Sequence, residues 1–122
     1  MTKEEVISNI KAQVNSHKEA INNLVTTDEC IVVVPHIDFG SGFHNSGETI
    51  VIDDEGCFKF LPYTTAEKVK AFTIKDARKA CKTRLGHEKN DITFTYKYEL
   101  VDIKEWHNRR IAELEELLSS FA

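Results

Sequence analysis

The sequence predicts one α+β domain spanning residues 1–122, with an antiparallel sheet of about four strands, an N-terminal helix, one inserted basic helix and a C-terminal amphipathic helix. Two observations predict this class. Both ends of the chain carry apolar residues at helical spacings of three and four. The middle carries short apolar runs and one long alternation of period two, which is typical of strands. A chain of this length forms one core, and we expect the helices to cover mainly one face of the sheet.

The first helix is predicted over about residues 3–24. Thr2 and Glu5 have the spacing of a capping box, in which each side chain satisfies a free backbone N–H of the first turn. The stripe of this helix consists of Val6, Ile10, Val14, His17, Ile21 and Leu24. His17 is its one polar member, and we expect it to pack at the stripe edge with a local hydrogen bond rather than to bind a ligand or sense pH.

The β-branched run 31–34 predicts a strand that is buried on both faces. Pro35 lacks a backbone N–H, so we expect regular pairing to end or bulge there. Residues 49–53 and 57–61 predict a hairpin. Residues 62–72 suit either a short helix or a short edge strand, and the pattern does not decide between them.

A second helix is predicted from Thr73, with an apolar stripe on one side and Gly86 in the position of a C-terminal cap. Its basic residues fall three and four apart and so share an exposed face: Lys75, Arg78, Lys79 and Lys82. The strict alternation over 91–101 predicts a long strand covered on one side. Asp102 and Glu105 then predict the start of the last helix in the manner of a capping box.

The charge is distributed unevenly along the chain. The net charge is −4, but residues 66–90 contain eight basic and three acidic residues, a net +5 that leaves −9 for the remainder. A basic segment in an acidic chain can create a local positive field that the total charge conceals. The charge pattern therefore favours an anionic ligand or partner at the second helix.

Composition and cysteine usage indicate an ordinary globular protein of the cytoplasm. The chain is 41% hydrophobic and 30% charged, and its apolar runs are too short to span a bilayer or to form a secretory core. Its cysteines are odd in number, widely spaced and free of a Cys-x-x-Cys motif: Cys30, Cys57 and Cys81. We expect reduced thiols, no cofactor and no membrane partner.

The irregular run 35–47 is the first candidate site. Its Gly40, Ser41 and Gly42, with His44, could bring backbone N–H groups close to an anion, although no P-loop or dinucleotide motif is present. The alternative is a metal site made of His36, Asp38 and His44, since two imidazoles and a carboxylate can bind zinc or iron. A polar hairpin loop without a ligand is the simplest interpretation of the same residues.

The last helix supplies the other candidates. Arg109 and Arg110 could reach a ligand phosphate as a fork, or could cover the core with their stems while the guanidinium groups pair with carboxylates. The apolar residues of this helix predict an interface with a second copy of the chain: Trp106, Leu114, Leu117 and Phe121. The predicted anion site combines Arg78 and Lys82 with these arginines and the glycine-rich run.

The function we expect is that of a small non-enzymatic binding protein, of the inhibitor, sequestering or accessory type that phages and mobile elements encode. It recognises an anionic ligand such as a nucleotide, or a partner protein, as a homo-oligomer; nucleic acid is a less favoured ligand. One alternative is a small metal-assisted hydrolase that uses His36, Asp38 and His44. The other is an acidic inhibitor that occupies the nucleic-acid groove of a partner.

Overall fold

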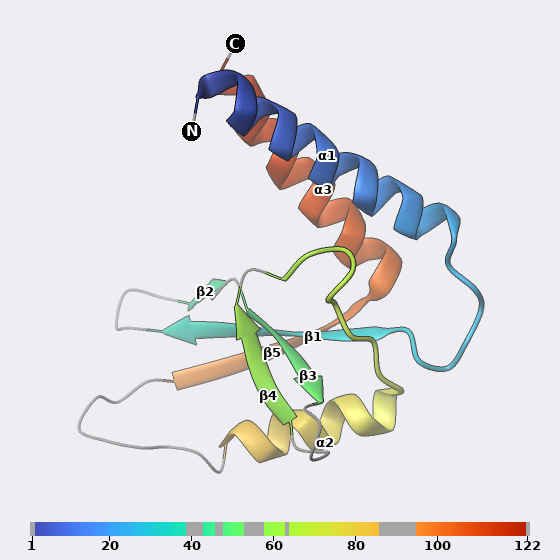
Figure 1. Ribbon diagram of the computed structural model, residues 1–122. Coiled ribbons are helices and arrows are strands. Elements are labelled where there is room, and N and C mark those ends of the chain that lie inside the picture. Colours follow the sequence, from blue (N-terminus) through green and yellow to red (C-terminus); the bar gives the residue numbers. More distant parts are fainter. Residues whose placement is uncertain are drawn as a thin grey trace.

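The computed structural model describes residues 2–38, 43–45, 48–52, 58–62, 64–85 and 95–121 (Figure 1). Its elements, in chain order, are α1 (Lys3–Asn22), β1 (Ile31–Asp38), β2 (Phe43–Asn45), β3 (Glu48–Ile52), β4 (Phe58–Pro62), α2 (Ile74–Leu85), β5 (Thr95–Asp102) and α3 (Ile103–Ser119). The α+β class and the helices at both ends are confirmed. None of the described helices is both long and apolar enough to cross a membrane.

The prediction of one sheet of about four strands is wrong. The described strands form a three-stranded antiparallel sheet, in the order β2-β1-β5, and a separate two-stranded hairpin of β3 and β4. The hairpin, predicted from the sequence, crosses the sheet instead of extending it (Figure 1). Ile50 of β3 packs on Val33 of β1, so the two strands meet through side chains rather than through a backbone ladder.

Pro35 does not interrupt β1, contrary to prediction. It pairs with Tyr98, and the β1–β5 register continues to Asp38. The backbone N–H and C=O of Ile31 bond to Phe72, on the side of β1 away from β5. Backbone groups alternate in direction along a strand, so the nitrogen of Pro35, four residues later, also points away from β5. No β5 hydrogen bond is lost, and β2 pairs only from His36 onward.

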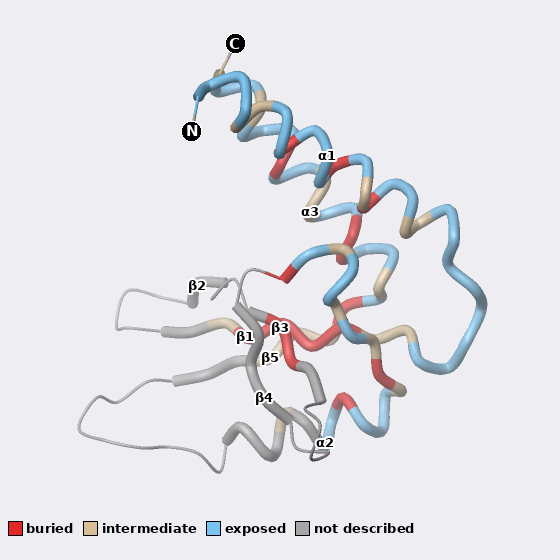
Figure 2. The backbone as a smooth tube through the Cα atoms, viewed as in Figure 1, coloured by how far each residue is buried: buried red, intermediate tan, exposed pale blue. Residues whose placement is uncertain are grey.

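The helices cover both faces of the sheet, so the expectation of one covered face is also wrong. Val33 packs with Ile50, Phe72 and Ala77 on the α2 side. Val32 and Val34 alternate with Val33 and pack with Val101 and Trp106 on the α3 side. In Figure 2, many of the buried segments lie where the sheet meets the helices. The apolar run at the start of β1 is continuous because both of its faces are buried.

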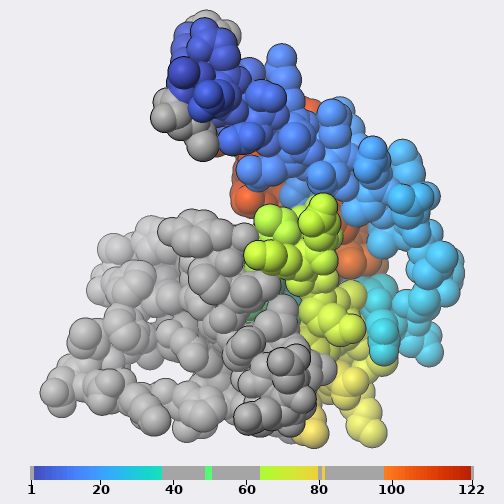
Figure 3. All heavy atoms as spheres, viewed as in Figure 1, coloured from blue at the N-terminus to red at the C-terminus, as the bar shows by residue number. Residues whose placement is uncertain are grey.

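α1 packs along α3, and the two helices run antiparallel away from the sheet, so that both termini lie at the same end of the molecule (Figure 1). In the space-filling view, α1 projects from the rest of the molecule and covers much of α3 (Figure 3). Ile10 and Val14 of α1 meet Leu114 of α3, and the flanking apolar residues Val6, Ile111, Leu118 and Phe121 pack around them. The apolar stripes of the two terminal helices therefore pack on each other within one chain.

The predicted helix starts are confirmed, with one difference. Glu5 N–H donates to Thr2 Oγ1 while the Glu5 carboxylate accepts from Thr2 N–H, which completes the capping box. Asp102 caps α3 by accepting from Lys104 N–H. Glu105 does not complete a second box, because its carboxylate accepts from Arg109 instead. Residues 64–73 form neither a helix nor a strand but a loop with a turn and a single bridge at Phe72.

Candidate functional site

α2 presents the basic face that the sequence predicts. Ala77 is fully buried and Cys81 packs beside it, so this side of the helix faces the core. Lys75, Arg78 and Lys79 are exposed on the other side, and the backbone position of Lys82, seven residues after Lys75, belongs to the same helical face. Burial raises the pKa of the Cys81 thiol, which disfavours the reactive thiolate. The basic face of α2 therefore offers positive charges for binding rather than a reactive thiol.

Arg109 is held by carboxylates of its own chain. Its guanidinium forms a bidentate pair with Glu99 of β5 at 2.9 Å, and its Nε donates to Glu105 at 3.1 Å. His36 Nε2 lies 3.1 Å from the same Glu99 carboxylate. The bond from Arg109 is the main reason that the pKa of Glu99 is lowered, and the bond to Glu99 raises that of Arg109. This network joins α3 to the sheet and neutralises the arginine.

The arginines of α3 and the basic face of α2 do not come together. Arg109 pairs with Glu99, which lies opposite Val34 and hence on the α3 face of the sheet, whereas α2 covers the other face. Arg110 Nη1 donates to Glu113, one turn along α3. Its Nε is buried and has no hydrogen-bond partner among the described residues. Of the two alternatives that the sequence allows for these arginines, the structure therefore has the pairing with carboxylates of the same chain.

Most of the candidate site residues in the glycine-rich run 35–47 lie outside the part of the chain that the structure describes. Gly40, Ser41 and Gly42 lie outside the described residues, as do the side chains of Asp38 and His44. The register of β1 and β2 pairs His44 with Ile37, one position out of step with His36 and Asp38. Strand positions alternate between faces, so this register does not favour a three-ligand site. Among the described side chains, no group of three or more His, Cys, Asp or Glu residues could hold a metal ion.

The four predicted interface residues of α3 have different surroundings. Trp106 is buried against the sheet, and Leu114 is buried against α1. Phe121 is half-buried at the end of the same seam. Leu117 alone is well exposed, at 47% of its surface. Of the four, Leu117 therefore offers the most surface to a second copy of the chain.

The most unusual buried group is a pair of histidines. His17 of α1 and His107 of α3 are 2% and 1% exposed, and their Nδ1 atoms lie 2.8 Å apart. The expectation of a local hydrogen bond for His17 is wrong, because the partner lies ninety residues away. Trp106 packs edge-on against both rings. The sequence did contain a signal for His107: it falls four residues after Ile103 and four before Ile111, on the apolar side of α3.

The histidine pair is held neutral at ordinary pH. Burial is the main cause that lowers the pKa of His17 from 6.5 to about 4, and the charges of His107 and Arg110 lower it further. Burial likewise lowers the pKa of His107. A neutral imidazole has one N–H donor and one bare nitrogen, so one ring must donate its Nδ1–H to the Nδ1 of the other. The pair thus joins two helices by a hydrogen bond in an apolar setting.

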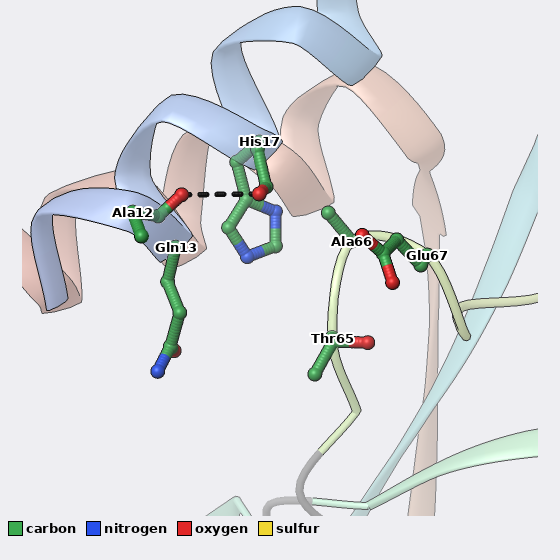
Figure 4. A pocket seen from close by; sticks show the side chains of 7 residues that line it. Ala12, Gln13, His17, Thr65, Ala66 and Glu67 are labelled. Carbon is green, nitrogen blue, oxygen red and sulfur yellow. Dashed lines mark hydrogen bonds between the residues drawn. The ribbon is translucent and has the colours of Figure 1, made fainter. Parts of the chain in front are cut away.

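A pocket of about 170 Å³ opens next to this pair, between α1 and the loop that begins at Thr64. It is lined by Ala12, Gln13, Ser16, His17, Thr65, Ala66 and Glu67. Figure 4 shows Gln13 and His17 on the α1 side and Thr65 and Glu67 on the loop side. The Ser16 hydroxyl donates to the Ala12 carbonyl at 3.0 Å, drawn as a dashed line in Figure 4. The loop is anchored to β3 by a 2.7 Å bond between the buried Thr64 and Thr49 hydroxyls.

Comparison with known proteins adds no relative to these observations. No protein-family model matches the chain, and neither a curated protein nor a solved structure has significant similarity to it.

Proposed function

We propose that this chain is a non-enzymatic binding protein of the inhibitor, sequestering or accessory type, and that it meets an anionic ligand or partner through α2. The observation that carries the proposal is the division of α2 into a buried side, with Ala77, and an exposed side with Lys75, Arg78 and Lys79. Arg109, in contrast, is already neutralised inside the chain. Of these two candidate sites, the basic face of α2 is therefore the more exposed.

The charge pattern supports this assignment. Lys75 and Arg78 are exposed, and neither forms an ion pair with another of the described residues. Asp76 is the one acidic residue in α2, and it lies at the first turn, where negative charge suits the helix dipole. A cationic face on an otherwise acidic protein orients the protein as it approaches a negatively charged surface, so that this face makes the contact.

Binding experiments with defined anions test the proposal. The probes are ATP, single-stranded and duplex DNA oligonucleotides, and poly-glutamate as an acidic polypeptide, each titrated at low and at high salt. We expect saturable binding of at least one probe that weakens with salt. Arg78→Glu should reduce this binding about tenfold or more, since it exchanges an attractive charge for a repulsive one.

Lys11→Glu is the matched control, because Lys11 is exposed on α1, away from α2. It makes the same change in net charge and should alter binding much less. The proposal fails if no probe binds, or if Arg78→Glu and Lys11→Glu have equal effects. Arg78 is exposed, so neither variant should change the fold, and circular dichroism checks that both remain folded.

A further inference from the structure

The pocket beside the histidine pair has features of a ligand site that are independent of α2. His17 is 2% exposed, yet it lines the pocket, and Figure 4 shows one of its ring nitrogens directed toward the space between Gln13 and Thr65. Nδ1 is directed at His107, so the nitrogen that faces the pocket is Nε2. A nine-tenths buried polar group is therefore aimed into an open cavity.

The hydrogen bond to His107 determines what Nε2 can do. When His17 donates its Nδ1–H to His107, its Nε2 is a bare acceptor; when His107 donates, Nε2 of His17 carries the hydrogen. The lowered pKa of His17 keeps the ring neutral near pH 7, so the acceptor form is available there. A ligand with N–H groups selects that form by donating to Nε2.

The charge of the side chains that line the pocket determines which kind of hydrogen-bond donor a ligand should carry. Glu67 is the one charged side chain among the seven residues that line the pocket, and it is exposed at the rim. Arg110, whose charge lowers the pKa of His17, also disfavours a cation near that ring, and its pairing with Glu113 offsets part of this charge. The pocket volume corresponds to about six groups the size of a water molecule.

We propose that this pocket binds a small primary amine as its ammonium ion, which donates to Nε2 of His17 and pairs with the carboxylate of Glu67. The three hydrogens of an ammonium group suit both acceptors at once. The apolar walls at Ala12 and Ala66 would contact the carbon chain of the amine. No bond is made or broken, so the site is a binding site and not a catalytic one.

The test uses the full chain with ¹⁵N-labelled histidine at neutral pH and constant ionic strength. The probes are ethylammonium, its neutral isostere ethanol, and acetate. We expect the His17 imidazole resonances to shift and saturate with ethylammonium at about millimolar concentration, as befits a ligand of three heavy atoms. Ethanol and acetate should bind more weakly.

Two matched variants locate the site. Glu67→Gln should weaken ethylammonium binding about fivefold by removing the counter-charge. Glu19→Gln removes the same charge from an exposed position on α1 that does not line the pocket, and it should have no effect. The proposal is overturned if the shift does not saturate, if both variants behave alike, or if acetate or ethanol binds as tightly as ethylammonium.

Discussion

His17 and His107, ninety residues apart in the chain, join α1 to α3 through a 2.8 Å contact between their Nδ1 atoms. Both rings are almost completely buried, and Trp106 packs against each of them. A buried polar group is costly unless it has a hydrogen-bond partner. Each histidine thus provides the hydrogen-bond partner that the other needs in order to be buried between apolar helices. The first two predictions follow from this mutual dependence.

Replacement of both histidines should cost less stability than the sum of the two single replacements. His17→Leu leaves the buried Nδ1 of His107 without its partner, and we expect a loss of about 1–3 kcal/mol in the free energy of unfolding. His107→Leu should have a similar effect. The double variant should cost less than the sum of the two, because no buried nitrogen of the pair is then unsatisfied. Urea denaturation measures all four proteins, and strictly additive losses would contradict the interpretation.

The stability of the protein should fall as the pH is lowered from 6.5 to 4. The pKa of His17 is about 4 in the folded chain and near 6.5 when exposed, so the unfolded chain binds more protons across this interval. Stability is therefore complete above pH 6.5 and falls by about 3 kcal/mol toward pH 4. The lowered pKa of His107 acts in the same direction.

The charges that act on His17 strengthen this effect, because His107 and Arg110 both disfavour a positive charge on its ring. Glu67, which lines the adjacent pocket, would favour that charge, but it is exposed at the rim, where solvent screens it. Urea denaturation at a series of pH values measures the dependence. In His17→Leu the slope between pH 6.5 and 4 should be much smaller, and an unchanged slope would assign the pH dependence to other groups.

The seam between α1 and α3 should respond sharply to truncation at Leu114. This side chain is 6% exposed and packs on Ile10 and Val14, so Leu114→Ala should cost about 2–5 kcal/mol. Leu117→Ala is the matched control on the same helix, and because Leu117 is 47% exposed it should change stability by less than about 0.5 kcal/mol. Comparable losses in thermal or urea denaturation would show that Leu117 is covered.

The homo-oligomer expected from the sequence can be tested at the same residue. If copies of the chain associate through the exposed surface of α3, Leu117→Glu should lower the mass measured by analytical ultracentrifugation without loss of helix content. Equal masses for Leu117→Glu and the parent chain, both above that of one chain, would place the contact elsewhere. If the parent chain and Leu117→Glu both have the mass of a single chain, the protein is a monomer and the prediction of a homo-oligomer is wrong.

The ion pairs of Arg109 should contribute little to the stability of the protein, and this contribution should depend on the bidentate geometry of the guanidinium group. The side chains of Arg109 and Glu99 are 44% and 38% exposed, so solvent screens the pair, and Arg109→Leu should cost no more than about 1 kcal/mol. Arg109→Lys keeps the charge but cannot form the bidentate pair, so it should lose most of the same energy. Full retention of stability by the lysine variant at low salt would indicate that charge alone matters.

Much of the secondary structure was predictable because its causes are local. The capping box of Thr2 and Glu5, the hairpin of β3 and β4 and the stripe of α2 each depend on residues close together in the chain. The basic face of α2 was predictable for the same reason, since helical spacing alone determines which side chains share a face. Glu105 was the exception, because the nearby Arg109 competed for its carboxylate.

The sequence by itself determined the α+β class, the positions of the helices and the charge of α2. Only the tertiary structure decided that β5 pairs along β1, that the hairpin crosses the sheet, and that Pro35 faces away from β5. It also decided that Arg109 is neutralised and that His17 meets His107. The reason is that spacing along the chain specifies periodicity and local bonds, whereas the partner of a buried side chain is determined by how distant segments pack.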